Sequence, residues 1–304
     1  MSSFNIKEVP SQKGRIAIVT GANIGLGYET ALAFAKKELK VIMACRNVQK
    51  AEQAKKDILS QSPNAELEIM PIDLSKLQSV KEFAKTFTTK YDQLDLLVNN
   101  AGVMMPPYSK TEDGFELQFG ANYLGHFLLT GLLMDMLLKT PNSRVVSLSS
   151  NAHKQGKINF DDLQSEKSYS KLGAYNQSKL ACLMFTYALQ RKLEKKGATT
   201  ISVAAHPGAS ITNLDQHIPK WVMGILMPIL KVTNIAQSAE AGAEPTSYAA
   251  LGKDVKGGDY FGPGGFGEFS GRAKKVKSTK LSHDEAIADR LWKVSEELTN
   301  FSYS

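Results

Sequence analysis

The chain has 304 residues, a formal net charge of +7 and two cysteines, and 42% of its residues are apolar and 22% charged. This composition is typical of a globular protein with a full core, and two cysteines inside apolar runs argue against a disulfide scaffold or a zinc site. The basic residues are scattered without interleaved aromatic residues, and no segment predicts a signal peptide or a transmembrane anchor, so we expect a cytoplasmic protein that binds no nucleic acid.

Strand-like and helix-like patterns alternate along the chain. Strands are predicted at 15–21, 40–45, 66–73, 95–102, 144–150, 200–208 and 257–263. Helices are predicted at 25–37, 48–59, 77–90, 115–138, 174–195 and 238–251, and a last helix near Ser282, which forms a capping-box pattern with Glu285. The early strands are almost entirely apolar, as buried parallel strands are. We therefore predict an α/β fold: a single doubly wound (Rossmann) domain over 1–304, with about seven parallel strands in the order 3-2-1-4-5-6-7 and helices on both faces.

Three connections interrupt the alternation, at 102–114, 151–171 and 209–237. Each follows the carboxyl end of a strand, the edge at which open α/β sheets bind ligands. We interpret 209–237 as a lid over a hydrophobic ligand, because it is apolar and Met-rich. An amphipathic helix that packs on the core or on a partner subunit is the alternative. The apolar side chains that motivate a lipophilic ligand are Trp221, Met223, Ile225, Leu226 and Met227.

A glycine-rich segment, "TGANIGLG", follows the first strand and opens the first helix. The spacing of Gly21, Gly25 and Gly27 predicts a tight turn, with Asn23 and Ile24 inside it, whose backbone N–H groups bind a pyrophosphate at the helix N-terminus. The Walker spacing of ATP- and GTP-binding proteins is absent. We therefore predict a dinucleotide site.

The second strand ends in Cys45 and Arg46, where NAD-binding proteins place an acidic residue against the ribose 2′-hydroxyl. A guanidinium group suits a 2′-phosphate, to which Asn23 could add a hydrogen bond, so NADP(H) is predicted in preference to NAD(H). A solvated role at the start of the next helix is the alternative for Arg46. Asp73, followed by Leu74, closes the third strand and is predicted to accept a hydrogen bond from the adenine amino group.

Tyr175 and Lys179 lie four residues apart in the helix predicted at 174–195, and therefore on one face of it. A cation about 4 Å from a phenol would stabilise the phenolate by roughly 4 kcal/mol at an effective dielectric of about 20. That favours acid–base work near neutral pH. Such pairs also arise by chance, as Tyr187 and Arg191 illustrate, so the pair alone is weak evidence.

Taken in order, these motifs resemble the short-chain dehydrogenase/reductase superfamily over residues 14–300, and within it the retinol-dehydrogenase-like and WW-domain-oxidoreductase-like branch. The resemblance rests on six stretches in the expected order: "TGANIGLG", "NNAG" at 99–102, "NYLGHF", "RVVSLSS", Tyr175-x-x-x-Lys179 and "HPGASIT" at 206–212.

The resemblance implies an oxidoreductase that acts on CH–OH groups with NADP as acceptor, or a carbonyl reductase in the other direction, with a hydrophobic alcohol, aldehyde or ketone as substrate. It implies that Tyr175 carries the proton, Ser150 polarises the carbonyl, Lys179 also holds the nicotinamide ribose and Asn122 supports a relay water. Ser150 is preferred over its neighbours Ser147 and Ser149 because it ends the strand. The remaining cofactor contacts implied are Asn100, Ala101, Gly102, Pro207, Gly208 and Thr212.

Family analogy also implies a homodimer or homotetramer, built partly on the helices at 115–138 and 174–195. Two other classes stay open on the residues. One is a catalytically silent NADP(H)-binding sensor or scaffold. The other is a SAM-dependent methyltransferase, in which Tyr175 and Lys179 would have no role.

Overall fold

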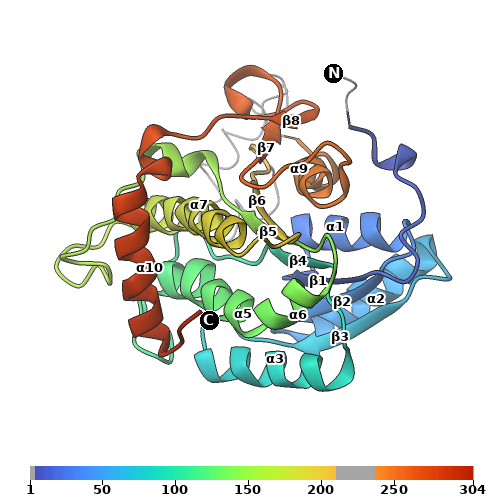
Figure 1. Cartoon of the computed structure of the whole chain (residues 1–304), viewed down its shortest axis with the longest axis horizontal. Coiled ribbons are helices and arrows are strands. Elements are labelled where there is room, and N and C mark those ends of the chain that lie inside the picture. Colours follow the sequence, from blue (N-terminus) through green and yellow to red (C-terminus); the bar gives the residue numbers. More distant parts are fainter. Residues whose placement is uncertain (1–3, 210–236, 304) are drawn as a thin grey trace, which may run out of the picture.

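The computed structural model of the chain describes residues 4–209 and 237–303. Eight strands form one continuous sheet in the order β3-β2-β1-β4-β5-β6-β7-β8 (Figure 1). The strands are β1 Ile16–Thr20, β2 Lys40–Cys45, β3 Leu67–Pro71, β4 Leu96–Asn99, β5 Arg144–Leu148, β6 Ile201–Ala205, β7 Tyr260–Pro263 and β8 Ala273–Lys275. The predicted doubly wound order is confirmed. The prediction missed β8, an antiparallel partner of β7, because its three residues include two exposed lysines and show no apolar period.

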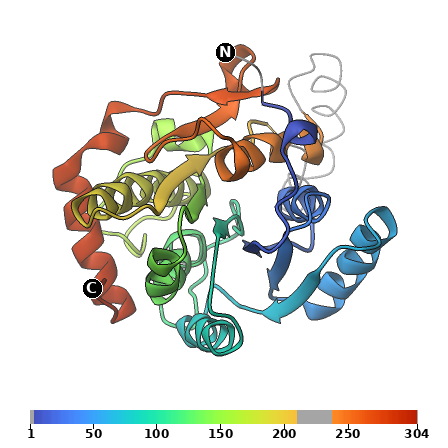
Figure 2. The same ribbon diagram turned by 45° about the vertical axis from the view of Figure 1, so that its right-hand side comes forward.

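Helices cover both faces of the sheet (Figure 2). On one face lie α1 Gly25–Ala35, α2 Val48–Gln61 and α9 Ala239–Leu251, and on the other lie α3 Leu77–Lys90, α5 Gly125–Leu132 and α7 Lys171–Lys195. Alternate residues of a strand point to opposite faces. In β1, Ile16 and Ile18 therefore join one core, and Ala17 and Val19 the other. This two-sided burial is the physical reason for the uninterrupted apolar strands.

The helix predicted at 115–138 is four pieces: α4 Leu117–Phe119, the π-helical turn η2 Gly120–Leu124, α5, and α6 Met134–Lys139. It begins where the Glu116 carboxylate accepts hydrogen bonds from the backbone N–H groups of Gln118 and Phe119, at 2.9 and 2.7 Å. A Cβ at Gly125 would lie 2.5 Å from the Leu74 carbonyl oxygen, so the segment passes very close to the loop that follows β3. Hydrophobic period cannot reveal a π turn, which often marks a functional site.

The last helix is α10 Glu285–Thr299, and its N-cap is Asp284, whose carboxylate accepts a hydrogen bond from the Ile287 N–H at 2.9 Å. The capping box predicted for Ser282 is therefore wrong. Ser282 lies in the preceding 3₁₀ turn, η5 Lys280–His283, and its hydroxyl is 2.6 Å from the carbonyl oxygen of Thr279. Ser282 therefore lies before α10 and does not cap it.

Helix α10 lies against α7 and beside α5 (Figure 1). Trp292 of α10 stacks on Phe185 with 5.7 Å between ring centres, and meets Phe127 edge-on at 5.1 Å. The apolar faces of α5 and α7 that suggested an oligomer interface are therefore covered in part by the chain itself. The homodimer or homotetramer stays a prediction. In the described part of the chain no helix combines the length and apolarity needed to cross a membrane.

Candidate active site

The glycine-rich turn after β1 folds tightly on itself. Gly21 and Gly25 have left-handed backbone angles, with φ of 69° and 59°. A Cβ at Gly27 would lie only 2.3 Å from the Gly21 carbonyl oxygen. Helix α1 begins at Gly25, and its N-cap residue, Ile24, makes no side-chain capping hydrogen bond. Uncapped N–H groups at a helix N-terminus are what a pyrophosphate requires, so the turn fits the dinucleotide that its sequence predicts.

The end of β4 is tied to the end of β1 beside this turn. The backbone N–H groups of Asn100 and Ala101 both donate to the Thr20 hydroxyl at 2.9 Å. The Asn100 side-chain amide donates to the Thr20 carbonyl at 2.7 Å. A Cβ at Gly21 would lie 3.1 Å from the Ala101 Cβ. The structure therefore brings Asn100 and Ala101 against the turn, next to exposed Gly102.

The ends of β2 and β3 hold the residues predicted at the adenosine end. Burial raises the pKa of the Cys45 thiol to about 12, although backbone hydrogen bonds from Ala22 and Asn23 favour its thiolate. Cys45 thus supports the glycine-rich turn, and Arg46 follows it as an exposed residue. One carboxylate oxygen of Asp73 accepts hydrogen bonds from the backbone N–H and the hydroxyl of Ser75, at 3.0 and 2.6 Å. Leu74 is buried, and its carbonyl contacts the start of α5.

Tyr175 and Lys179 lie on one face of α7. The Lys179 Nζ atom is 5.8 Å from the centre of the Tyr175 ring and donates a hydrogen bond of 3.1 Å to the Leu148 carbonyl at the end of β5. Lys179 is only 6% exposed, and no carboxylate pairs with it among residues 4–209 and 237–303. A buried ammonium without a carboxylate is costly. It therefore supplies uncompensated positive charge beside the phenol.

Asn122, in the π turn, joins the loop after β4 to α7. Its side-chain oxygen accepts from the Val103 N–H at 2.7 Å, and its side-chain nitrogen donates to the Val103 carbonyl and the Ser178 hydroxyl, each at 3.0 Å. A Cβ at Gly102 would lie 3.1 Å from the Asn122 side-chain oxygen and 3.6 Å from Lys179 Nζ. Three residues predicted separately, Gly102, Asn122 and Lys179, therefore meet at one point.

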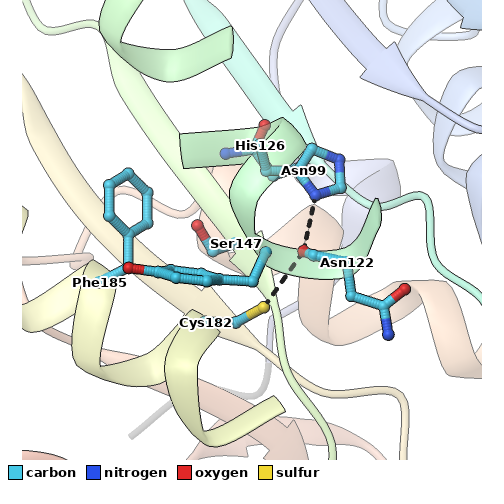
Figure 3. Close-up of a pocket in the computed structure, with 7 residues that line it drawn as sticks. Asn99, Asn122, His126, Ser147, Cys182 and Phe185 are labelled. Carbon is cyan, nitrogen blue, oxygen red and sulfur yellow. Dashed lines mark hydrogen bonds between the residues drawn. The ribbon is translucent and has the colours of Figure 1, made fainter. Parts of the chain in front are cut away.

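The main-chain carbonyl of Asn122 is already engaged by two side chains (Figure 3). His126 Nδ1 approaches it at 2.9 Å and the Cys182 thiol at 3.4 Å. Since the carbonyl can only accept, the neutral His126 ring carries its proton on Nδ1, and Nε2 accepts from the Thr20 hydroxyl at 2.9 Å. Burial lowers the pKa of His126 to about 4, which keeps the ring neutral. His126 thus connects Asn122 to the end of β1.

Asn122 and His126 are among the residues that line a cavity of about 10 Å³ (Figure 3). It has room for about one water molecule and none for a substrate. The side-chain oxygen of Asn99 and the hydroxyl of Ser147, both in its lining, have no hydrogen-bond partner in the described part of the chain. The cavity is therefore part of the packing that supports the site, and it is not a substrate pocket.

Ser150 is the N-cap of a short 3₁₀ helix, η3 Asn151–Gln155. Its hydroxyl oxygen accepts from the Ala152 N–H at 3.2 Å, which leaves its proton free to be donated elsewhere. By contrast, the Ser149 hydroxyl is buried and donates to the Lys179 carbonyl at 2.8 Å. A Cβ at Gly156 would lie 2.6 Å from the Asn176 carbonyl oxygen, so the end of this segment packs on α7 next to Tyr175. These contacts favour Ser150 among the three serines.

The turn after β6 carries Pro207 and Gly208, and Gly208 has a left-handed φ of 67°. The Ala209 N–H donates to the Phe269 carbonyl at 2.8 Å, and the Gln237 side-chain amide donates to the Pro207 carbonyl at 2.6 Å. Thr212 and positions 210–236 of the predicted lid lie outside the described residues. The sequence analysis did not place Glu268 near the site, because a glutamate in a glycine-rich stretch carries no recognisable signal. Its carboxylate is 3.1 Å from His206 Nε2.

A doubly wound sheet with this glycine-rich turn defines the class of Rossmann-type dinucleotide-binding proteins. The "short chain dehydrogenase" family model matches residues 15–222, and the chain belongs to this family. Mouse (Mus musculus) retinol dehydrogenase 12 is 39% identical over 292 residues, which cover 95% of this chain and 88% of the relative. Human (Homo sapiens) retinol dehydrogenase 13 is 40% identical over 292 residues, with 94% and 84% covered.

Two solved structures extend the comparison. A protein of uncharacterized function from Mycobacterium Paratuberculosis superimposes with a TM-score of 0.83 at 38% identity and full coverage of both chains. A short chain dehydrogenase from Shigella flexneri 2a str. 301, complexed with NADP, has a TM-score of 0.63 at 22% identity, with 82% of this chain and 96% of that chain covered. The second likeness supports the fold alone.

Proposed function

We propose that this protein transfers a hydride between NADP(H) and a hydrophobic alcohol, aldehyde or ketone through a site made of Ser150, Tyr175, Lys179 and Asn122. The observation that carries the proposal is the buried ammonium of Lys179, which has no carboxylate partner in the described residues and lies 5.8 Å from the Tyr175 ring centre. A purely structural lysine would rarely be left in that state.

In this proposal the nicotinamide, when bound, supplies or accepts the hydride. Tyr175 gives a proton to the substrate oxygen during reduction and takes one during oxidation. Lys179 stabilises the phenolate that forms. The Ser150 hydroxyl accepts from the Ala152 N–H, and its proton is free to be donated to the same substrate oxygen. Asn122 holds the loop after β4 against α7 and so keeps Lys179 in place.

The preference for NADP(H) over NAD(H) rests on the end of β2. Arg46 is exposed there, directly after the buried Cys45 that supports the glycine-rich turn. A guanidinium at this place favours a 2′-phosphate, and a carboxylate that would repel one is missing from "MACRN". The cofactor contacts predicted from Gly21, Gly25 and Gly27 suit the pyrophosphate of either dinucleotide.

The substrate class rests on relatives and on sequence. Curated relatives that share 38–41% of their residues with this chain are named retinol dehydrogenases, which favours a lipophilic alcohol or carbonyl substrate. The apolar residues predicted in the lid favour the same class. Retinoid specificity itself is not part of the proposal. Cytoplasmic localisation stays a prediction from the sequence.

The test is a spectrophotometric assay at the NADPH absorbance band with a panel of aliphatic, aromatic and terpenoid aldehydes and ketones. Tyr175→Phe is expected to lower kcat by about 10²–10⁴-fold. Tyr187→Phe is the matched control, because Tyr187 lies on the same helix and its hydroxyl contacts Ser278 at 2.8 Å, away from Lys179. Tight NADPH binding with no turnover of any substrate would instead support the silent sensor or scaffold.

A further inference from the structure

The hairpin between β7 and β8 touches the short helix that Ser150 caps. The Asn151 side-chain amide donates to the carbonyl oxygens of Gly267 and Glu268, each at 3.2 Å. Lys154, on the same helix η3, donates to the Glu268 carboxylate at 3.2 Å. Two residues of η3 therefore hold the tip of the hairpin.

The same hairpin tip touches the turn after β6. The Phe269 carbonyl accepts the Ala209 N–H at 2.8 Å. A Cβ at Gly208 would lie only 2.3 Å from that carbonyl oxygen, so the two backbones are in close contact. The oxygen of Glu268 that accepts from Lys154 also lies 3.1 Å from His206 Nε2. One carboxylate oxygen thus faces both η3 and the start of the 206–209 turn.

His206 is fully buried, and burial lowers its pKa, so its ring is neutral near pH 7. Its Nδ1 accepts from the Gly208 N–H at 3.3 Å, and the ring proton must therefore lie on Nε2, toward Glu268. The carboxylate stands off the line of that N–H bond, since Nε2 has no aligned hydrogen-bond partner among the described residues. The contact is an attraction between a charge and a ring dipole. Lys154 contacts the same carboxylate from η3.

The backbone of Glu268 supports a specific role for its side chain. Its φ is 59°, a left-handed conformation that disfavours residues other than glycine, asparagine and aspartate. Such strain persists where surrounding contacts over-determine the conformation, and it clusters at functional sites. A glutamate therefore occupies a position at which glycine would be easier to accommodate.

From these contacts we propose that Glu268 is a positioning residue for hydride transfer. It holds η3, the helix that Ser150 caps, against the 206–209 turn. The Ser150 hydroxyl, which faces the substrate, and the turn, which lies beside the nicotinamide, therefore keep a fixed relative position. This inference rests on the proposed function. In this role Glu268 touches neither substrate nor cofactor, and it acts through its contacts with η3 and His206.

The test compares three variants with the parent protein. Glu268→Gly removes the carboxylate and relieves the backbone strain. Glu268→Gln keeps an acceptor oxygen without the charge. Glu66→Ala is the matched control. Glu66 also pairs with a lysine, Lys40 at 3.3 Å, but this pair lies where β2 and β3 begin, at the opposite edge of the sheet from the candidate site. Each is assayed with NADPH and with NADPH deuterated at the transferred position, and its thermal midpoint is measured.

We expect Glu268→Gly to lower kcat by about 10- to 100-fold and to enlarge the deuterium isotope effect on kcat, because a misplaced hydride donor makes the chemical step slower. Its thermal midpoint should stay within about 3 °C of the parent. Glu268→Gln should recover only part of the rate, because its oxygen can still accept from Lys154 but carries no charge to attract the His206 ring, and Glu66→Ala should match the parent. An unchanged rate in Glu268→Gly, or a lower rate with an unchanged isotope effect, overturns the inference.

A failure of the proposed function itself has a different signature, in which neither the parent protein nor Tyr175→Phe turns over any substrate. The contact can then be tested alone through the imidazole ¹⁵N shifts of His206, assigned with a His206→Gln variant. The parent should show a neutral ring protonated on Nε2, with a shift that changes in Glu268→Gly. Identical His206 shifts in the two proteins overturn the inference without any reference to activity.

Discussion

A methyl group at Gly27 tests the phosphate-binding turn directly. The Cβ of an alanine would lie 2.3 Å from the Gly21 carbonyl oxygen and 2.5 Å from the Asn100 side-chain nitrogen, whereas Cβ atoms in proteins essentially never come within 3.0 Å of a non-bonded atom. Neither neighbour can yield easily. The first is backbone of the turn itself, and the second is held by the Thr20 carbonyl at 2.7 Å. Gly27→Ala must therefore open the turn.

The size of the effect follows from the cost of overpacking, which is about 1–3 kcal/mol. Since each 1.4 kcal/mol changes a dissociation constant by about tenfold, the Kd for NADPH should rise by about 5- to 150-fold. Part of the strain should also appear as a lower thermal midpoint in the protein without cofactor.

Titration calorimetry with NADPH, together with thermal unfolding, measures both quantities. Gly173→Ala is the control, because Gly173 is exposed in the first turn of α7 and a Cβ there would lie 3.3 Å from the Ser170 Cβ. Alanine in a helix favours folding by about 0.5–1 kcal/mol over glycine, so this variant should keep the parental Kd. Unaltered NADPH affinity in Gly27→Ala would refute the assignment of the turn to the pyrophosphate.

Two further predictions concern cofactor choice and acid stability. Arg46→Glu should lower the ratio of kcat/KM for NADPH over NADH by about 100-fold, because like charges at a binding site cost several kcal/mol; an unchanged ratio would remove Arg46 from the 2′-phosphate site. Burial holds the pKa of His126 at about 4 in the folded state, against about 6.5 in an unfolded chain. As pH falls from 6.5 to 4 the unfolded state alone binds this proton, so the free energy of unfolding should decrease by about 3 kcal/mol over that window and level off below it. Urea unfolding at several pH values measures this slope, and His126→Gln should lose that part of it; equal slopes would contradict the burial argument.

The alternation of strands and helices could be predicted from the sequence because its signals are local. Seven apolar strands and the glycine spacing after β1 are visible in short windows, and the strand order follows from right-handed crossovers. The i, i+4 spacing of Tyr175 and Lys179 likewise places both on one face of α7 without any knowledge of the rest of the chain.

Other features depend on contacts between distant parts of the chain. The π turn that carries Asn122 directly precedes Gly125, which approaches the Leu74 carbonyl closely, and no periodicity signals it. The 3₁₀ turn that removes Ser282 from the start of α10 depends on Thr279 and Ser278, whose hydroxyl meets Tyr187 at 2.8 Å. The apolar faces of α5 and α7 suggested a partner subunit, and only the folded chain shows that α10 covers part of them.

The sequence by itself therefore determined the architecture, the family and the pairing of Tyr175 with Lys179, because hydrophobic period and motif spacing act over a few residues. Only the tertiary structure decided which groups surround that pair: the unpaired state of the Lys179 ammonium among the described residues, the contact of Asn122 with Gly102, and the place of Glu268 between η3 and His206. These contacts depend on which strand ends meet at one edge of the sheet. They join residues that lie more than fifty positions apart in the sequence, so no short stretch of sequence can reveal them.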